Sequence, residues 1–92
     1  MGDVQSAELD EHRASPFPAG VDKGEIYGEV EPVMIDADII GWISHGRLTP
    51  VQKRSLREAS DQLDRSLRSF PSDAQPYYER LLRIARRALA AD

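Results

Sequence analysis

Residues 49–89 read TPVQKRSLREASDQLDRSLRSFPSDAQPYYERLLRIARRAL, and this stretch decides the fold. Thr49 is a good N-cap, Pro50 suits the first helical position, and Gln52 completes a capping box. Apolar residues then recur at spacings of three and four up to Pro71: Leu56, Ala59, Leu63, Leu67 and Phe70. This spacing predicts a helix over residues 50–70.

The second half of the stretch predicts another helix, over residues 74–90. Asp73 is its expected cap, because it leaves Pro76 in the first turn, where a missing N–H costs little. The apolar residues fill one arc of the helical projection: Tyr77, Tyr78, Leu81, Leu82, Ile84, Ala85, Ala88 and Leu89. Charged residues fill the opposite arc, so the helix is expected to bury one face and to present a basic one.

A short third helix is expected over residues 37–45. Asp36 would cap it, Asp38 would lie in its first turn, and Gly46 would end it. The apolar face consists of Ile39, Ile40 and Ile43, with Trp42 at its edge. The fold class is therefore mainly α, with a three-helix body in a single small domain that spans residues 25–92.

Residues 25–35 are the one segment with a strand-like pattern. Ile26, Val30 and Met34 fall on one side of an extended chain. Gly28 and Pro32 argue against a central strand. A lone strand has unpaired backbone groups on both edges, so this arm would pair with a second copy, pair with another protein, or lie over the helices.

Residues 1–24 are polar and interrupted by Pro16, Pro18, Gly20 and Gly24. We expect a disordered acidic tail, because the apolar residues are too scattered to form a face. A helix over residues 3–13 would be frayed, since isolated helices of about 11 residues are marginal in water.

Composition excludes several classes of protein. The 92 residues carry a net charge of −4 and no cysteine, which removes disulfides and thiolate metal sites. The charge is divided unevenly, with −8 in residues 1–46 and +4 in residues 47–92. No apolar run has the length of a signal peptide or a membrane helix, so a cytoplasmic location without membrane contact is expected.

No arrangement of residues points to catalysis, a cofactor or a metal site. Ser44 and His45 are neighbours, and neighbouring side chains on a helix diverge by about 100°. Glu8 and His12 have a spacing that is not specific for a metal and lie in the expected tail. We therefore expect neither an enzyme nor a metalloprotein.

Four arginines of the last helix form a possible basic face: Arg80, Arg83, Arg86 and Arg87. This face makes a nucleic-acid-associated regulator the alternative function. The competing interpretation is a solvated helix surface with acid–base pairs four residues apart. The expected pairs are Asp61 with Arg65, Asp64 with Arg68, and Glu79 with Arg83.

The sequence favours a non-enzymatic protein–protein interaction module, such as a small inhibitor, antitoxin, immunity protein or adaptor. Its partner would be another protein, a second copy in a homodimer, or both. The acidic arm and the edge of the short helix supply the predicted partner-binding residues: Ile26, Tyr27, Glu29, Val30, Glu31, Asp38 and Trp42. They would act through steric and electrostatic contact.

Overall fold

The two C-terminal helices form the pair that the sequence predicts. The computed structural model describes residues 4–44 and 46–90, and in them α3 (Pro50–Ser66) runs into a single 3-10 turn, η1 (Leu67–Ser69), before α4 (Gln75–Ala90). The capping box is present, since the Thr49 side chain accepts from the Gln52 N–H and the Gln52 side chain accepts from the Thr49 N–H. The mainly helical fold class is confirmed.

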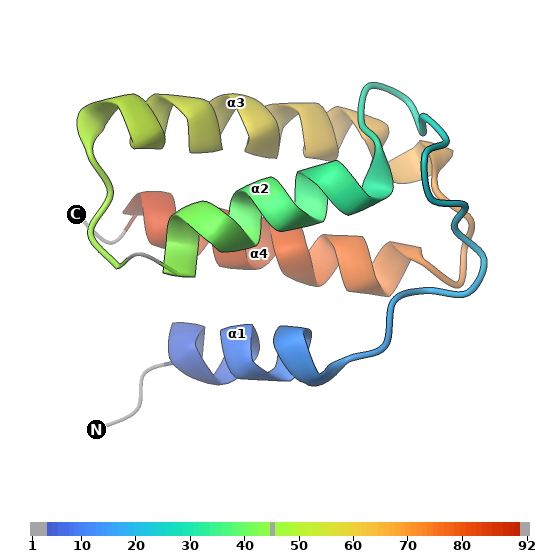
Figure 1. Ribbon diagram of the computed structural model, residues 1–92, viewed down its shortest axis with the longest axis horizontal. Helices are drawn as coiled ribbons and strands as arrows, with labels where there is room; N and C mark the ends of the chain where they lie inside the picture. The colour runs from blue at the N-terminus through green and yellow to red at the C-terminus, as the bar shows by residue number, and fades with distance from the viewer. Residues whose placement is uncertain (1–3, 45, 91–92) are drawn as a thin grey trace.

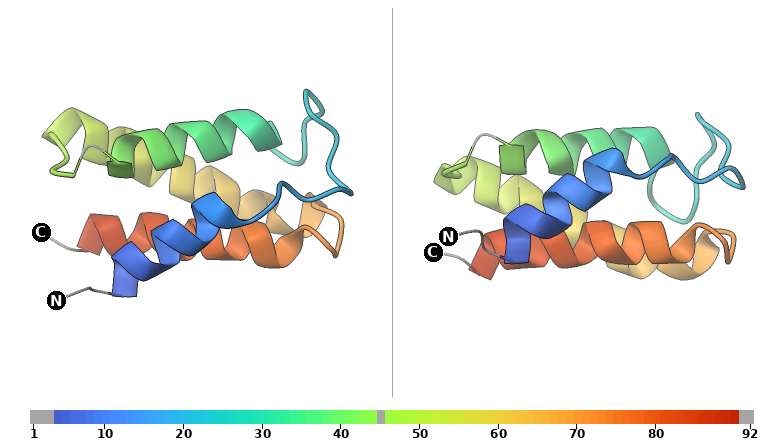
Figure 2. Two further views of the ribbon diagram at one scale, coloured as in Figure 1. Left: turned by 60° about the horizontal axis from the view of Figure 1, so that its bottom comes forward. Right: turned by 90° about the horizontal axis from the view of Figure 1, so that it is seen from below.

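Two further helices complete the fold, α1 (Val4–Ala14) and α2 (Pro32–Ser44), so the described residues hold four α-helices rather than three. α4 contacts each of the other helices. Figure 1 shows α2 in front of α4 and below α3, and Figure 2 shows α1 lying across the side formed by α2 and α4, away from α3. The largest fully buried apolar side chains include Ile39, Leu56, Leu63, Tyr78, Leu81 and Ile84.

The expected disordered tail is wrong for much of its length, because residues 4–14 form α1. Glu8 of α1 pairs with Arg83 at 3.2 Å and with Arg87, both on α4. His12 is only 3% exposed, and Leu9 packs against the core. A short helix that is marginal alone is thus stabilised by contacts with a segment about 75 residues away. Residues 1–3 lie outside the described part of the chain.

The expected strand-like arm is also wrong. Tyr27 and Val30 bond to each other through both backbone pairs, at 2.8 and 3.1 Å, and so close a tight turn. The turn packs on the body: the Glu29 N–H donates to Ser66 Oγ at 2.9 Å, and the Tyr27 ring stacks on Phe70 at 5.1 Å between centroids. The expectation of a partner for this segment rested on unpaired backbone groups. These groups of Tyr27, Glu29 and Val30 bond within the chain, so that reason is removed.

Gly28 makes this turn possible. Its φ is +63°, and an added Cβ would lie 2.7 Å from Ser66 Oγ. Glycine is the residue that tolerates both a positive φ and such a close approach. The alternation of apolar residues here therefore reflects a turn followed by a helix, rather than a strand.

α2 begins five residues earlier than expected, at Pro32 instead of Ala37. Glu31 acts as its cap, since one carboxylate oxygen accepts from the Met34 N–H and the other from the Gly24 N–H, each at 2.8 Å. Pro32 then occupies the first helical position, where a proline is favoured. Asp36 lies inside the helix and is not its cap; the expected last residue, His45, lies outside the described residues.

We predict that Glu31→Gln lowers the melting temperature at neutral pH. The backbone N–H groups of Gly24 and Met34 hold the pKa of the Glu31 carboxyl below its ordinary 4.5. A carboxyl whose pKa is lowered by folding contributes stability above its unfolded pKa, and this contribution is lost as the pH falls through the folded pKa. The melting curves of the variant and the unmodified chain should therefore converge as the pH falls below the lowered pKa of Glu31.

Glu25→Gln is the matched control, because Glu25 is exposed and its side chain makes no hydrogen bond within the described residues. It should change the melting temperature little at any pH. An equal effect of the two substitutions at neutral pH would contradict the capping role of Glu31.

Candidate functional site

The outer face of α2 is the most unusual surface of the molecule. α2 reads PVMIDADIIGWIS and carries only two charged residues, Asp36 and Asp38. A helix that is apolar on all sides is normally buried on all sides. α2 instead buries one side, with Ile35, Ile39 and Ile43, and leaves the opposite side in solvent.

We define the outer face by five exposed residues of α2: Val33, Met34, Ala37, Asp38 and Gly41. At about 100° per residue, Ala37 and Gly41 point most directly away from the buried side. Met34 lies next to them and is 59% exposed, while Val33 on one flank is 36% exposed. Asp38 lies on the other flank. The face therefore has a centre of small residues, a large apolar side chain at one end, and one charge.

Gly41 has no role inside the molecule that would require a glycine. An added Cβ would meet no atom within 4 Å, and the glycine does not have a positive φ. A glycine in the interior of an exposed helix costs about 1 kcal/mol relative to alanine. Glycine also lets another backbone come close. Gly41 is thus a point on the exposed side of α2 where no side chain covers the backbone.

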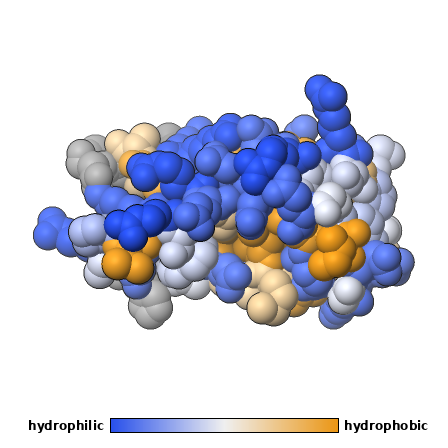
Figure 3. All heavy atoms as spheres, turned by 90° about the horizontal axis from the view of Figure 1, so that it is seen from above, coloured by the Kyte–Doolittle hydropathy of each residue, from blue (hydrophilic) through white to orange (hydrophobic). Residues whose placement is uncertain are grey.

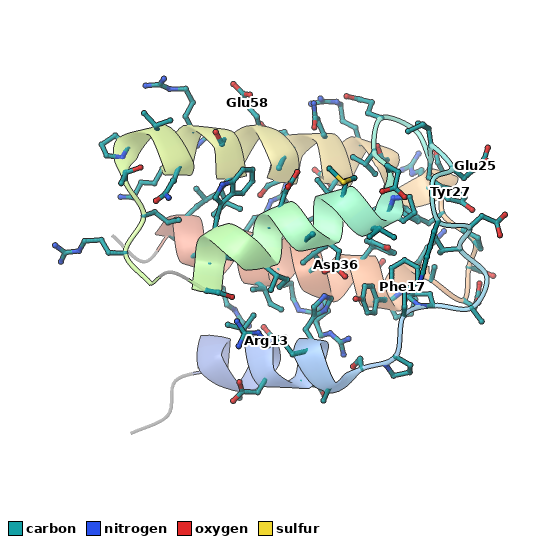
Figure 4. All side chains as sticks on the ribbon, viewed as in Figure 1. Arg13, Phe17, Glu25, Tyr27, Asp36 and Glu58 are labelled. Atoms are coloured by element: carbon teal, nitrogen blue, oxygen red, sulfur yellow. The ribbon has the colours of Figure 1, made fainter. Side chains whose placement is uncertain are left out.

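A shallow cleft of about 360 Å³ adjoins the outer face. Val33, Ala37 and Ile40 of α2 form one wall, and Phe17, from the segment after α1, forms another. Arg13 and Lys23 add positive charge to its lining. Figure 4 shows Asp36 and Phe17 in this region, between α2 and α1. The cleft extends the apolar surface of α2 on its Val33 flank.

A network of polar side chains forms the base of the cleft and joins three helices. Asp36 of α2 accepts from the Tyr77 hydroxyl at 2.5 Å and lies 2.8 Å from His12 Nε2. Arg80 Nε donates to His12 Nδ1 at 3.3 Å. With Nδ1 accepting from Arg80, His12 donates its Nε2–H to Asp36.

This network fastens α1 to α2 and α4. Burial, followed by the bond to Asp36, raises the pKa of the Tyr77 hydroxyl, which therefore stays a protonated donor. No buried side-chain nitrogen or oxygen of the described residues lacks a hydrogen-bond partner, and these residues contain no group of three or more His, Cys, Asp or Glu side chains that could hold a metal ion. Ser44 donates to the Ile40 carbonyl at 2.6 Å and accepts from Arg13.

The predicted basic face of α4 is paired with acids. Arg83 and Arg87 bond to Glu8 of α1, and Arg86 lies 2.9 Å from Asp64 of α3. Arg80 is mostly buried and lies 3.7 Å from Glu11. None of these pairs is local in sequence.

The local pairs expected on the helix surfaces are replaced by distant ones. Arg65 bonds through two nitrogens to Glu29, at 2.7 and 2.8 Å, rather than to Asp61. This contact lowers the pKa of Glu29 and raises that of Arg65. The uneven distribution of charge along the chain thus serves the packing of its first half on its second.

The structure separates the predicted partner-binding residues into two groups. Ile26, which is 60% exposed, and Asp38 are available at the surface. The others take part in the fold: Tyr27 and Glu29 contact the body, Val30 is 4% exposed, Glu31 caps α2, and Trp42 is half-buried against the core. Figure 4 shows Glu25 and Tyr27 at the end of the molecule where α2 begins.

Sequence reasoning missed Val33, Met34, Ala37 and Gly41. A signal was present, because residues 32–44 are apolar at almost every position and include a mid-helix glycine. This signal could be interpreted only once it was known that the helix begins at Pro32.

A second hollow, of about 530 Å³, lies between the end of α3 and the start of α4. Its lining is mostly polar and carries charges of both signs, with Asp64, Arg65, Arg68 and Glu79 among its residues. It has no apolar floor comparable to that of the cleft beside α2, so we do not assign it a role. None of the described helices has the length and apolar character that crossing a membrane requires.

We predict that Asp36→Ala loosens α1. The substitution leaves the His12 Nε2–H and the Tyr77 hydroxyl without their acceptor in a partly buried place, at a cost of about 1–3 kcal/mol. Amide hydrogen exchange should accelerate more in α1 than in α3 and α4. Asp38→Ala, two residues away on the exposed face, is the control and should change stability by less than about 0.5 kcal/mol. Equal protection of α1 in the two variants would refute the fastening role.

Comparisons with known proteins add no identity to this arrangement: no family model, no curated protein and no solved structure matches the chain.

Proposed function

We propose that this chain is a non-enzymatic protein–protein interaction module, of the kind represented by small inhibitors, antitoxins, immunity proteins and adaptors, and that it binds through the outer face of α2. One observation carries the proposal. α2 exposes Val33, Met34, Ala37 and Gly41 to solvent with a single charged residue, Asp38, among them.

The distribution of apolar residues supports this surface over others. Exposed apolar residues scattered singly are common on proteins and need no explanation, whereas neighbouring ones mark contact sites. Val51 on α3 is 64% exposed and is an example of such a single exposed apolar residue. Val33 and Met34 are neighbours on one helix. Figure 3, which views the molecule from above, shows apolar patches set in a largely hydrophilic surface.

Ile26 is available beside the start of the same helix. The bonds from Gly24 and Met34 to the two oxygens of Glu31 hold the loop that carries Ile26 against the first turn of α2. Ile26 is therefore positioned as a border residue of the same surface, together with Glu25. An interface with an apolar centre and charged residues at its border is the usual composition of protein–protein contacts.

The ion pairs of α4 give less support to the nucleic-acid alternative. A phosphate-binding surface requires arginines that are free to neutralise phosphates. Arg83, Arg86 and Arg87 instead bond to Glu8 and Asp64, and a nucleic acid would have to displace these acids. The mechanism that fits the surface is steric contact through the apolar face, with Asp38 and Glu25 contributing charge.

The proposal is tested by photo-crosslinking in cells that express the chain. A photoreactive residue at position 34 should give a discrete adduct with a protein, because Met34 points outward from the proposed surface. The same residue at position 62 is the control, since Gln62 is exposed on a different helix, α3. A second substitution, Gly41→Arg, should abolish the adduct formed at position 34. Adducts of similar yield at the two positions, or none at position 34, would refute the proposal.

A further inference from the structure

The outer face of α2 is complementary to itself in one orientation. The large side chain of this face, Met34, lies toward the start of the helix. Gly41, which has no side chain, lies two turns later. If two copies of α2 pack face to face and antiparallel, with the two-fold axis midway between these positions, Met34 of each copy lies over Gly41 of the other. Ala37 lies beside the axis, where bulk would hold the helices apart, and Asp38 lies at the same level on the flank of each helix. A parallel pairing would instead place methionine on methionine and leave a gap at glycine.

Charge outside the face favours the same orientation. The start of α2 is bordered by Glu25, an exposed acid whose side chain has no partner among the described residues, whereas nearby Glu29 is already bonded to Arg65. Its end is bordered by basic residues, since Arg13 bonds to Ser44 and Arg47 follows three residues after the helix. Figure 4 shows Glu25 and Arg13 toward opposite ends of α2. Antiparallel copies bring the acidic end of one against the basic end of the other, whereas parallel copies oppose like charges.

We propose that the partner of the outer face is a second copy of this chain, bound through an antiparallel, two-fold pair of α2 helices. This inference rests on the proposed function and names its partner. Contacts of this type are isologous, so every favourable contact occurs twice. Helix α2 has 13 residues and is therefore about 20 Å long, too short to bury a standard interface alone. The dimer should accordingly be weak and in rapid exchange with the monomer.

Self-association is measured by sedimentation over about 1 µM to 1 mM, the range of weak interfaces. The unmodified chain should pass from monomer to dimer. Gly41→Met places methionine on methionine at both contacts and should raise Kd about tenfold or more. Met34→Ala leaves both contacts underfilled and should also raise Kd. Each variant is expected to stay folded, because both positions are exposed to solvent.

The decisive step is to mix these two variants. In the mixed pair, each contact joins one methionine to one small residue, so the heterodimer should form more tightly than either variant alone. Restored affinity on mixing requires that position 34 of one copy face position 41 of the other. Two variants that stay as weak together as apart would overturn the antiparallel register.

Gly41→Ala gives a separate test, in which a weaker dimer could not be explained by loss of folding. It should raise the melting temperature of the dilute monomer, because alanine favours a helix more than glycine and the added Cβ meets no neighbour. It should nevertheless raise Kd, since the Cβ lies between the paired backbones. An unchanged or lower Kd would place the dimer contact elsewhere.

The outcome also separates this inference from the proposed function. A chain that remains monomeric throughout, yet crosslinks through position 34 to a different protein, would keep the interaction module and remove the second copy as its partner. A chain that neither dimerises nor crosslinks would remove both.

Discussion

The structure depends on the covering of α4 from several sides. α2 and α3 enclose its apolar side, where Tyr78, Leu81 and Ile84 are fully buried. Its arginine side is met by the acids of α1 and by Asp64. A chain of 92 residues has a small core, and such cores are marginal unless most elements contribute to them. α2 covers α4 with one side only. The opposite side of α2, the outer face, is apolar and lies in solvent.

Two kinds of polar contact hold the helices around α4. Asp36 joins α2 to α1 and α4 inside the molecule, where its partners have little access to water, so each bond there is costly to lose. The ion pairs of Glu8 and Glu29 lie nearer the surface, where solvent and salt weaken them. The position of α1 is therefore fixed chiefly by the buried network and by the apolar contacts of α1. The surface ion pairs align Glu8 of α1 with Arg83 and Arg87 of α4.

The parts of the fold that could be predicted are those with local causes. The capping box at Thr49 and the apolar spacing of α3 and α4 act within a few residues, and both helices were predicted within a few residues of their ends. The sequence allowed a frayed helix over residues 3–13, but the stability of α1 could not be predicted, because it comes from Arg83, Arg87 and the Asp36 network. The start of α2 was misread because alternating apolar residues fit a strand and a turn-plus-helix equally well. The outer face could not be inferred until it was known which side of α2 the core occupies.

The central claim is that the outer face of α2 is a contact surface between two copies of the chain. The most direct measurement is a dilution series followed by the backbone amide resonances of the protein in solution. Amides of residues 33–41 and of the bordering residues 25–27 should shift progressively with concentration, while those on the exposed side of α3 stay constant. Resonances that are independent of concentration everywhere, or shifts confined to another surface, would contradict the claim.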